Sequence, residues 1–313
     1  MEKICPRCGA RFECRHDSIE SCHCTSVPLS DEQRDYIARN YSGCLCHHCQ
    51  EKITTDPHPV SVRELANFLL DLSRTLMGAG AHTSRVVRNV TRIAESFGYK
   101  VDMTIFQMHI TMTIRHAGDD TIRRTSVGKI GPAAFNFDTI SQISSLSWEA
   151  HDERLSFREL TEKYERIIRK PRISRWWVLV LVTAANACFC RLFGGDVPAM
   201  GLVAAATFVG FFMRQEMSAR HANHMAIFLI CSFIASLIAS AGFRFHLGTT
   251  PETALGTSVL FLIPGVPLIN AIFDLLEGHV LVGISRAVNA LILIVCIALG
   301  LSATMLILGL DTL

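Results

Sequence analysis

The sequence predicts an α-helical membrane protein with five transmembrane helices, an N-terminal cytoplasmic α/β domain and a small cysteine-rich head. Five apolar stretches fill the last 138 residues, and 47 of the 58 Asp, Glu, Lys and Arg residues precede Trp176. Eight of the twelve cysteines fall within the first 49 residues. These shifts in composition predict three domains, which cover residues 1–55, 60–172 and 173–313.

Each apolar stretch is long enough to cross a bilayer as a helix. The first begins at Trp176 and is interrupted only by Asn186 and Arg191. The others cover residues 197–213, 225–243, 253–273 and 287–310. A helix needs about 20 residues to cross roughly 30 Å of hydrocarbon. In a soluble protein, polar segments would have to cover five such helices. Too few polar residues remain here, so we expect the helices to lie in a lipid bilayer.

The basic residues favour a cytoplasmic N-terminus. Positive charge gathers before the first span, after the second and after the fourth, at Arg169, Lys170, Arg172, Arg175, Arg214, Arg220 and Arg286. The opposite loops carry one arginine each, Arg191 and Arg244. Because cytoplasmic loops carry an excess of Lys and Arg, five spans place Leu313 outside. We expect no cleaved signal peptide, since the N-terminus lacks an apolar core.

The cysteine-rich head has the spacing of a metal-binding segment. Its pattern reads C-x2-C, then C-x-C, then C-x-C-x2-C, with His16, His23, His47 and His48 interspersed. About fifty residues bury too little apolar area to fold unaided, and closely spaced thiolates in a reducing cytoplasm bind zinc. We expect one or two structural Zn2+ ions, while disulfides and an iron–sulfur cluster are the weaker alternatives. The predicted ligands are Cys5, Cys8, Cys14, Cys22, Cys24, Cys44, Cys46 and Cys49. The segment also resembles the small cysteine-rich CWC family, although His23 stands where that family has tryptophan.

The middle of the chain changes from helical to strand periodicity and back. Helices are predicted over residues 62–77, from about Thr83, and over 137–150 and 157–169, with three strands between about 101 and 127. Pro57-His-Pro59 is the predicted linker before this domain. His82, Thr83 and Ser84 lie together, but no nucleophile elbow or oxyanion motif accompanies them. We therefore expect no enzyme, and the absence of a basic, aromatic-rich stripe argues against nucleic-acid binding.

The fourth apolar stretch contains the most informative residues for function. Pro264, Gly265 and Pro267 should break the helix in mid-span, which exposes backbone N–H groups that attract anions. Asn270 lies one turn beyond the break and Asp274 one further turn on the same face. This arrangement suits a carboxylate-bearing solute, with Asp274 as a candidate proton carrier. A packing kink, with Asp274 at the cytoplasmic interface, explains the same residues equally well.

Two more polar residues of the membrane domain are candidates for the same site. Arg286, at the mouth of the last span, either attracts an anion or follows the positive-inside rule. Asn186 either lines the cavity or makes an interhelical hydrogen bond. The spacing alone leaves both alternatives open.

Residues 62–310 resemble the threonine/serine exporter family, most closely its split, two-subunit branch associated with succinate export. The most specific match is the string Pro-Gly-Val-Pro-Leu-Ile-Asn at 264–270, and Ala-Cys-Phe-Cys at 187–190 is also similar. Further matching segments are 80–85, 175–177, 214–215, 219–221, Gly283 and Arg286. The resemblance implies a multi-pass protein of the bacterial inner membrane that exports small carboxylates or amino acids such as threonine and serine. The membrane potential or a proton gradient would drive it.

The same resemblance implies a partner. Family members have ten spans in two five-helix halves, and in the split branch the second half is a separate, smaller protein. Five spans without an internal repeat therefore predict a second, smaller membrane subunit, and homo-oligomers remain compatible with the sequence. The competing hypothesis is a membrane-anchored metal-sensing or interaction module without transport activity. An anchor, however, has no reason to interrupt a helix in lipid.

Overall fold

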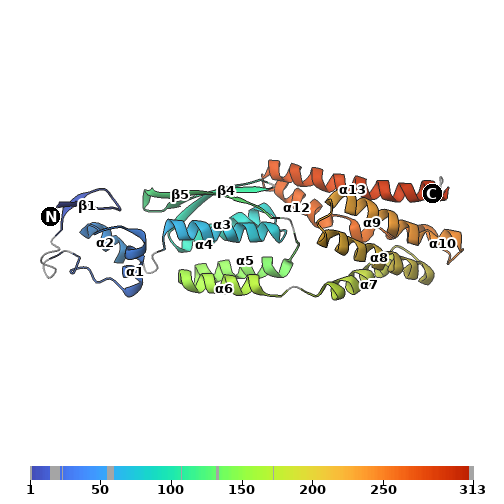
Figure 1. The fold of residues 1–313 in the computed structure, drawn as a ribbon, viewed down its shortest axis with the longest axis horizontal. Coiled ribbons are helices and arrows are strands. Elements are labelled where there is room, and N and C mark those ends of the chain that lie inside the picture. The colour runs from blue at the N-terminus through green and yellow to red at the C-terminus, as the bar shows by residue number, and fades with distance from the viewer. Residues whose placement is uncertain are drawn as a thin grey trace. The chain divides into compact units, whose positions relative to one another are not determined.

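The computed structural model describes residues 2–14, 22, 24–54, 60–106, 108–131, 134–171 and 173–309. It divides into two compact units, Met1–Lys170 and Pro171–Leu313 (Figure 1). Several residues that the sequence singled out lie outside the described residues, namely His16, His23, the linker at 57–59, Arg172 and Leu313.

The cysteine-rich head contains two short strands and two helices. Its antiparallel strands are β1 (Glu2–Ile4) and β2 (Arg11–Glu13), and its helices are α1 (Asp31–Asn40) and α2 (His47–Thr54). Ser30 caps α1 in a capping box, since its hydroxyl accepts from the Gln33 N–H and the Gln33 side chain accepts from the Ser30 N–H. The small apolar cluster of the head includes two cysteines. Its fully buried members are Cys5, Leu45, Cys49 and Ile53.

The middle part of the first unit combines an antiparallel sheet with four helices. The sheet has the order β3–β4–β5, and helix α3 packs against β4 and β5 while α4 packs against β3. The strands are β3 (Tyr99–Ile105), β4 (His109–His116) and β5 (Asp119–Lys129). The helices are α3 (Val62–Gly78), α4 (Thr83–Ser96), α5 (Phe137–Asp152) and α6 (Phe157–Arg169). One continuous apolar core joins these elements, with Leu69, Leu72 and Ile114 fully buried.

Three helices of this region begin at residues whose capping contacts are defined. Ser156 and Glu159 form a complete capping box at α6. At α3, Ser61 accepts from the Glu64 N–H, but the Glu64 carboxylate accepts from the Ser61 hydroxyl, at 2.7 Å. At α4, His82 occupies the N-cap and Thr83 is the first helical residue, buried with 1% exposure. The helix therefore begins at Thr83, where the sequence predicts its start.

The second unit contains four helices long and apolar enough to cross a membrane. They are α7 (Arg175–Leu192), α8 (Val197–Ala219), α9 (His224–Ala239), extended by α10 (Ala241–Arg244), and α13 (Val280–Leu308). A broken segment consists of α11 (Pro251–Thr257), the 3-10 turn η2 (Leu260–Leu262) and α12 (Gly265–Leu276), with a bend of 61° between its halves. The described residues therefore provide four candidate spans, or five if the bent pair crosses.

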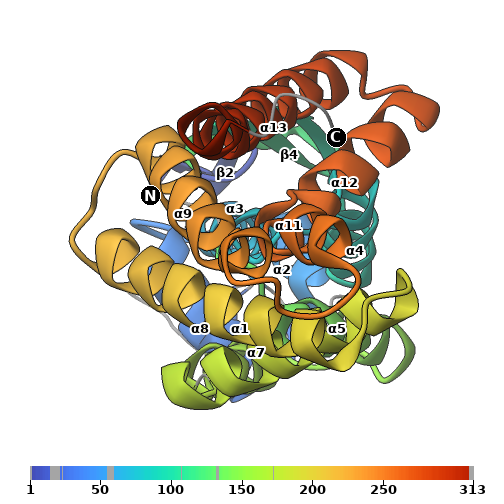
Figure 2. The ribbon, with the colours of Figure 1, turned by 90° about the vertical axis from the view of Figure 1, so that its right-hand side faces the viewer.

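Helix α13 runs parallel to α9. Gly300 lies against Leu229 and Ser232, and one turn later the Thr304 hydroxyl contacts that of Ser236 at 2.7 Å. The residue numbers of the contacting positions thus increase together along both helices, so both helices begin on the same side of the unit. Figure 2 shows α8 beside α9 and α9 beside α13. Helix α13 also begins seven residues before the predicted span at 287, and this first part contains Arg286, which is paired inside the unit.

Candidate functional site

The broken span has a defined cause in the backbone. Pro264 has no N–H, and the Gly265 N–H donates to the Ile263 carbonyl at 2.8 Å instead of continuing the helix. Helix α12 then begins, with the Leu268 N–H donating to the Pro264 carbonyl at 3.1 Å. The Phe261 carbonyl receives no backbone N–H from the next turn, because the residue three positions later is Pro264, which has no N–H. The sequence signal for this break was therefore reliable.

A buried ion pair lies beyond the break. Arg286 Nη1 on α13 is 3.0 Å from Asp274 Oδ2 on α12, and the side chains are 14% and 0% exposed. The two helices approach closely here because Gly283 has no side chain. A Cβ at that position would lie 2.7 Å from Leu275 Cγ and 3.0 Å from the Ala271 carbonyl oxygen. The sequence nominated Asp274 and Arg286 separately, and the structure brings them together.

The other nominated residues divide into two places. Asn270 is half-buried on α12, one turn before Asp274, whereas Gly265 and Pro267 lie in the first turn of α12. Asn186 lies before the break, on α7, and is 3% exposed. Its amide Nδ2 donates to Thr207 Oγ1 on α8 at 2.6 Å and to the Thr257 carbonyl at the end of α11 at 3.2 Å. Of the two interpretations of Asn186, the interhelical hydrogen bond is thus observed.

One arginine near the break was assigned by sequence only to the positive-inside pattern. Arg214, on α8, donates from Nη1 to the Phe261 carbonyl, at 3.5 Å. Its guanidinium carbon lies 5.1 Å from the ring centre of Phe228 and 5.7 Å from that of Phe211. The sequence places Arg214 directly after the apolar stretch at 197–213, whereas the structure places it inside α8, five residues before the helix ends.

Four cysteines of the head form a group that can hold a metal ion. The sulfur atoms of Cys5, Cys8, Cys46 and Cys49 all lie within 4.8 Å of one another, and those of Cys8 and Cys46 are 3.6 Å apart. Zn–S bonds of about 2.3 Å in a tetrahedron separate the sulfurs by about 3.8 Å, so the spacing fits. Burial would raise the pKa of the Cys5 thiol, but backbone N–H groups of Cys46, Cys8 and Arg7 lower it to about 6.

The remaining four cysteines of the head form two pairs of thiols in contact. The sulfurs of Cys14 and Cys44 are 3.8 Å apart. Contact with the Cys22 thiol, together with burial, raises the pKa of Cys24 to about 11. Among the described residues, the tight four-ligand geometry is found only in the first set. Sequence spacing predicted eight ligands without indicating how they divide.

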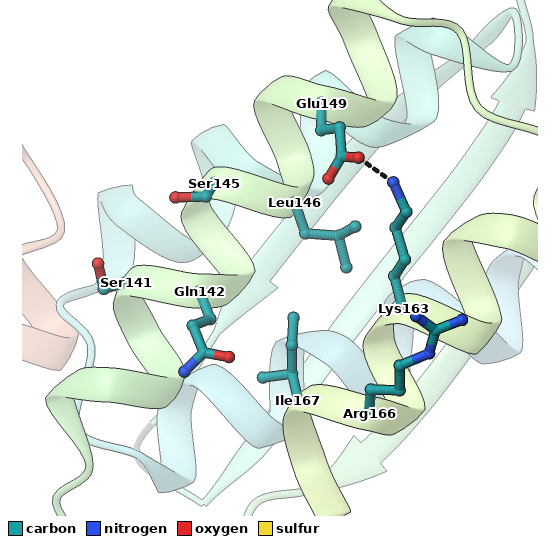
Figure 3. Close-up of a pocket in the computed structure, with 8 residues that line it drawn as sticks. All are labelled: Ser141, Gln142, Ser145, Leu146, Glu149, Lys163, Arg166 and Ile167. Carbon is teal, nitrogen blue, oxygen red and sulfur yellow. Dashed lines mark hydrogen bonds and ion pairs between the residues drawn. The ribbon is translucent and has the colours of Figure 1, made fainter. Parts of the chain in front are cut away.

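A depression of about 310 Å3 on the first unit lies between α5 and α6 (Figure 3). Lys163 and Glu149 form an ion pair across it, and Leu146 and Ile167 form its apolar floor. The residues with nucleophilic chemistry that the sequence grouped, His82, Thr83 and Ser84, do not line this depression. It contains none of the residues that the sequence nominated for binding.

The broken span, the buried ion pair and the apolar helices define an integral membrane protein of the transporter class. Residues 67–308 match the family described as "Putative threonine/serine exporter", and residues 5–51 match the cysteine-rich CWC family. The first match covers well over half of the chain, so this chain belongs to the threonine/serine exporter family and is a membrane exporter subunit.

Two curated relatives extend over the same region. The chain is 27% identical over 248 residues to the "Probable succinate transporter subunit YjjP" of Klebsiella aerogenes, covering 78% of this chain and 94% of the relative. It is likewise 27% identical over 252 residues to the protein of that name from Escherichia coli K12, covering 79% and 96%. No solved structure matches the chain.

Proposed function

We propose that this chain is the large subunit of a secondary exporter of small carboxylates, with succinate-like dicarboxylates as the first candidates and amino acids such as threonine and serine as the second. The observation that carries the proposal is the buried Asp274–Arg286 pair at the end of a broken span. Ionisable residues inside a membrane protein are costly and usually mark a transport pathway. The printed names of the relatives, which are succinate transporter subunits, favour the dicarboxylate.

Five crossings are proposed for the second unit. Helices α9 and α13 run parallel, so the chain must return to the same side between them. The broken segment α11–η2–α12 is the part of the chain that can make this return. With the basic residues at the inner ends, five crossings would put the N-terminus in the cytoplasm and the C-terminus outside. The five-helix unit then requires a second, smaller membrane subunit to complete the carrier.

The proposed role of the ion pair depends on the charge of the solute. A carboxylate that binds Arg286 displaces Asp274, which then loses its counter-charge inside the membrane unit. Asp274 is therefore the proposed proton carrier during the binding of succinate. A zwitterionic amino acid can instead place its ammonium group on Asp274 and its carboxylate on Arg286, so its binding needs no proton. Pro264, Gly265, Pro267 and Asn270 would line the same pathway.

Efflux from vesicles that contain this chain with its partner subunit tests the proposal. We expect loaded succinate or another four-carbon acid to leave faster than from vesicles that hold either subunit alone. Threonine and serine, measured in the same vesicles, decide between the two solute classes. Equal leakage from all vesicles for every solute would exclude an exporter of either class.

We also propose that the eight cysteines of the head bind two structural zinc ions. The first site would be Cys5, Cys8, Cys46 and Cys49, supported by their mutual distances. The second would be Cys14, Cys22, Cys24 and Cys44, supported by the 3.8 Å separation of Cys14 and Cys44. Metal analysis of the purified full chain should give two zinc ions. Cys5→Ser and Cys14→Ser should each remove one, and Cys188→Ser, on α7, should remove none.

The alternative function, a membrane-anchored metal sensor, makes the opposite prediction for the two regions. A sensor should tolerate Asp274→Asn and lose its function with Cys5→Ser. An exporter should lose export with Asp274→Asn, even when zinc content is unchanged. Export measured on these two variants separates the two functions, and the interrupted helix supports the exporter.

A further inference from the structure

Two arginines of the membrane unit are withdrawn from water, and they differ in their counter-charge. Arg286 is paired with the buried Asp274. Arg214 is partly buried on α8, and among residues 171 and 173–309 no carboxylate lies within ion-pairing distance of it. The acidic side chain nearest to it in sequence, Glu216, pairs with Arg175 at 2.9 Å. Arg214 thus retains a full positive charge beside the broken span.

The contacts of Arg214 leave most of its donors unused. A guanidinium has five N–H donors and binds carboxylates with two parallel hydrogen bonds. In the described structure its hydrogen bond goes to the Phe261 carbonyl, at 3.5 Å, which is at the limit of bonding distance. The Arg214 cation lies over the rings of Phe211 and Phe228, which stabilise it and exclude water. The rings accept no hydrogen bond from the N–H groups in the plane of the guanidinium.

The position of Arg214 is fixed by the break itself. The Phe261 carbonyl is available because Pro264 cannot donate to it and the Gly265 N–H donates to Ile263. Gly210, one turn earlier on α8, admits the Phe261 ring, since a Cβ there would lie 2.8 Å from Phe261 Cζ. The interruption of the helix and the unpaired charge of Arg214 therefore belong to one arrangement.

We propose that Arg214 is a binding residue for the carboxylate of the exported solute, beside the break in the broken span. This inference rests on the proposed function and adds a residue to it. Arg286 would receive a carboxylate only after its pair with Asp274 opens, whereas Arg214 can receive one directly. Arg214 would therefore bind an anionic solute while the pair is still closed.

The test uses Arg214→Gln, which removes the charge, and Arg214→Lys, which keeps the charge but loses the bidentate geometry. Arg220→Gln is the matched control, because Arg220 is exposed at the end of the same helix. Efflux of succinate is measured in vesicles containing this chain and its partner subunit. We expect Arg214→Gln to raise the KM for succinate roughly ten- to hundredfold, Arg214→Lys to raise it less, and Arg220→Gln to leave it unchanged.

A second measurement separates binding from folding. Succinate should raise the thermal unfolding temperature of the full-length chain in detergent, and uncharged succinamide should not. Arg214→Gln should lose this stabilisation and Arg220→Gln should keep it. If Arg214→Gln fails to fold, Arg214→Lys decides: an increased KM at an unchanged unfolding temperature supports the inference, and an unchanged KM overturns it.

The phosphate of an anionic lipid could occupy Arg214 with the same chemistry. Vesicles of phosphatidylcholine alone, compared with vesicles that also contain phosphatidylglycerol, distinguish the two sources. If Arg214→Gln keeps the KM for succinate and abolishes only a dependence of the rate on phosphatidylglycerol, the solute assignment is wrong.

If the unmodified complex transports succinate and Arg214→Gln leaves the KM for succinate unchanged, this inference is overturned but the proposed function is not. If the unmodified protein shows neither efflux nor stabilisation by any acid, the proposed function fails as well.

Discussion

The two units of this chain place apolar and polar side chains in opposite ways. In the first unit, Leu69 and Leu72 are fully buried and the charged residues lie outside. In the second, Leu281 is 72% and Leu291 55% exposed, while Asp274 is completely buried. The difference shows that each part is matched to its surroundings, because lipid replaces water as the solvent for the second unit.

Both units nevertheless link helices through buried polar side chains. In the first unit, Asn89 Nδ2 donates to Ser144 Oγ at 3.1 Å, and Arg92 donates to Ser147 Oγ at 2.7 Å, joining α4 to α5. In the second, Asn186 joins three elements in the same way. The membrane unit differs in that it also buries a charge pair, and the following predictions test that contrast.

Breaking the buried pair should have the largest effect on stability. Arg286→Gln leaves the Asp274 charge buried without compensation, which costs about 3–5 kcal/mol. Unfolding of the purified chain in detergent measures this loss. Adding Asp274→Asn should recover most of it, because the uncompensated charge is then removed. Arg175→Gln, which breaks the exposed pair with Glu216, should cost less than about 1 kcal/mol. Equal losses for both arginines would contradict the contrast.

A matched pair of leucine substitutions compares the two solvents directly. Leu72→Ala should destabilise the first unit by about 2–5 kcal/mol, because it leaves a cavity in a closed core. Leu291→Ala, on the exposed face of α13, leaves no cavity and should change stability by less than about 0.5 kcal/mol. Denaturant unfolding of each variant gives the comparison. A large loss at Leu291 would instead indicate that this face is covered by another protein surface.

The stability of the close contact between α9 and α13 should be sensitive to one added methyl group. A Cβ at Gly300 would overlap Ser232 and lie 2.6 Å from the Leu229 carbonyl, so Gly300→Ala should cost about 1–3 kcal/mol. Gly201→Ala is the control, since nothing lies within 4 Å of its added Cβ. This control should be neutral or slightly stabilising, because alanine favours helix. Thermal unfolding of the two variants should therefore shift in different directions.

Removing the interhelical amide should have a smaller effect. Asn186→Ala loses two hydrogen bonds between helices and should cost about 1 kcal/mol. Asn289→Ala, whose amide bonds only to Ser285 on its own helix, should cost less. Export is measured alongside stability. Loss of export by Asn186→Ala at unchanged stability would restore the cavity-lining interpretation of this residue.

The smallest expected effect is a pH dependence in the loops of the second unit. Hydrogen bonds from the N–H groups of Thr249 and Ala199, and from the Thr249 hydroxyl, lower the pKa of Asp196 to about 2. A carboxylate with a lowered pKa contributes stability above its ordinary pKa, near 4, and loses it as pH falls toward 2. Asp196→Ala should therefore be less stable than the unmodified chain at pH 7. The difference in unfolding temperature between them should narrow between pH 5 and pH 3, and a constant difference would contradict this assignment.

Local chemistry was predictable from the sequence, and contacts between distant segments were not. Pro264 breaks the helix because it lacks an N–H, and Ser30 and Ser156 cap helices through neighbours three residues away. The pairing of Asp274 with Arg286 depends instead on Gly283 letting two helices touch. No spacing rule gives that approach, since the same residues would also fit separate roles.

The head illustrates the same limit. The spacing of its cysteines predicts eight ligands, but the grouping of Cys5 and Cys8 with Cys46 and Cys49 arises from the fold. Arg214 shows it again. Its position in a basic loop region suggested topology alone, whereas its carbonyl partner becomes available only through the break at Pro264.

The closed pair between α12 and α13 has an electrical consequence. Its two charges cancel, so moving it within the lipid performs almost no work against the membrane potential. A bound dianion does not cancel in this way. Moving each uncompensated charge across the membrane changes the free energy by about 2.3 kcal/mol per 100 mV of membrane potential. The resting voltage of a cell, negative inside, would thus push a bound dianion outward, while the closed pair would add almost nothing to that work.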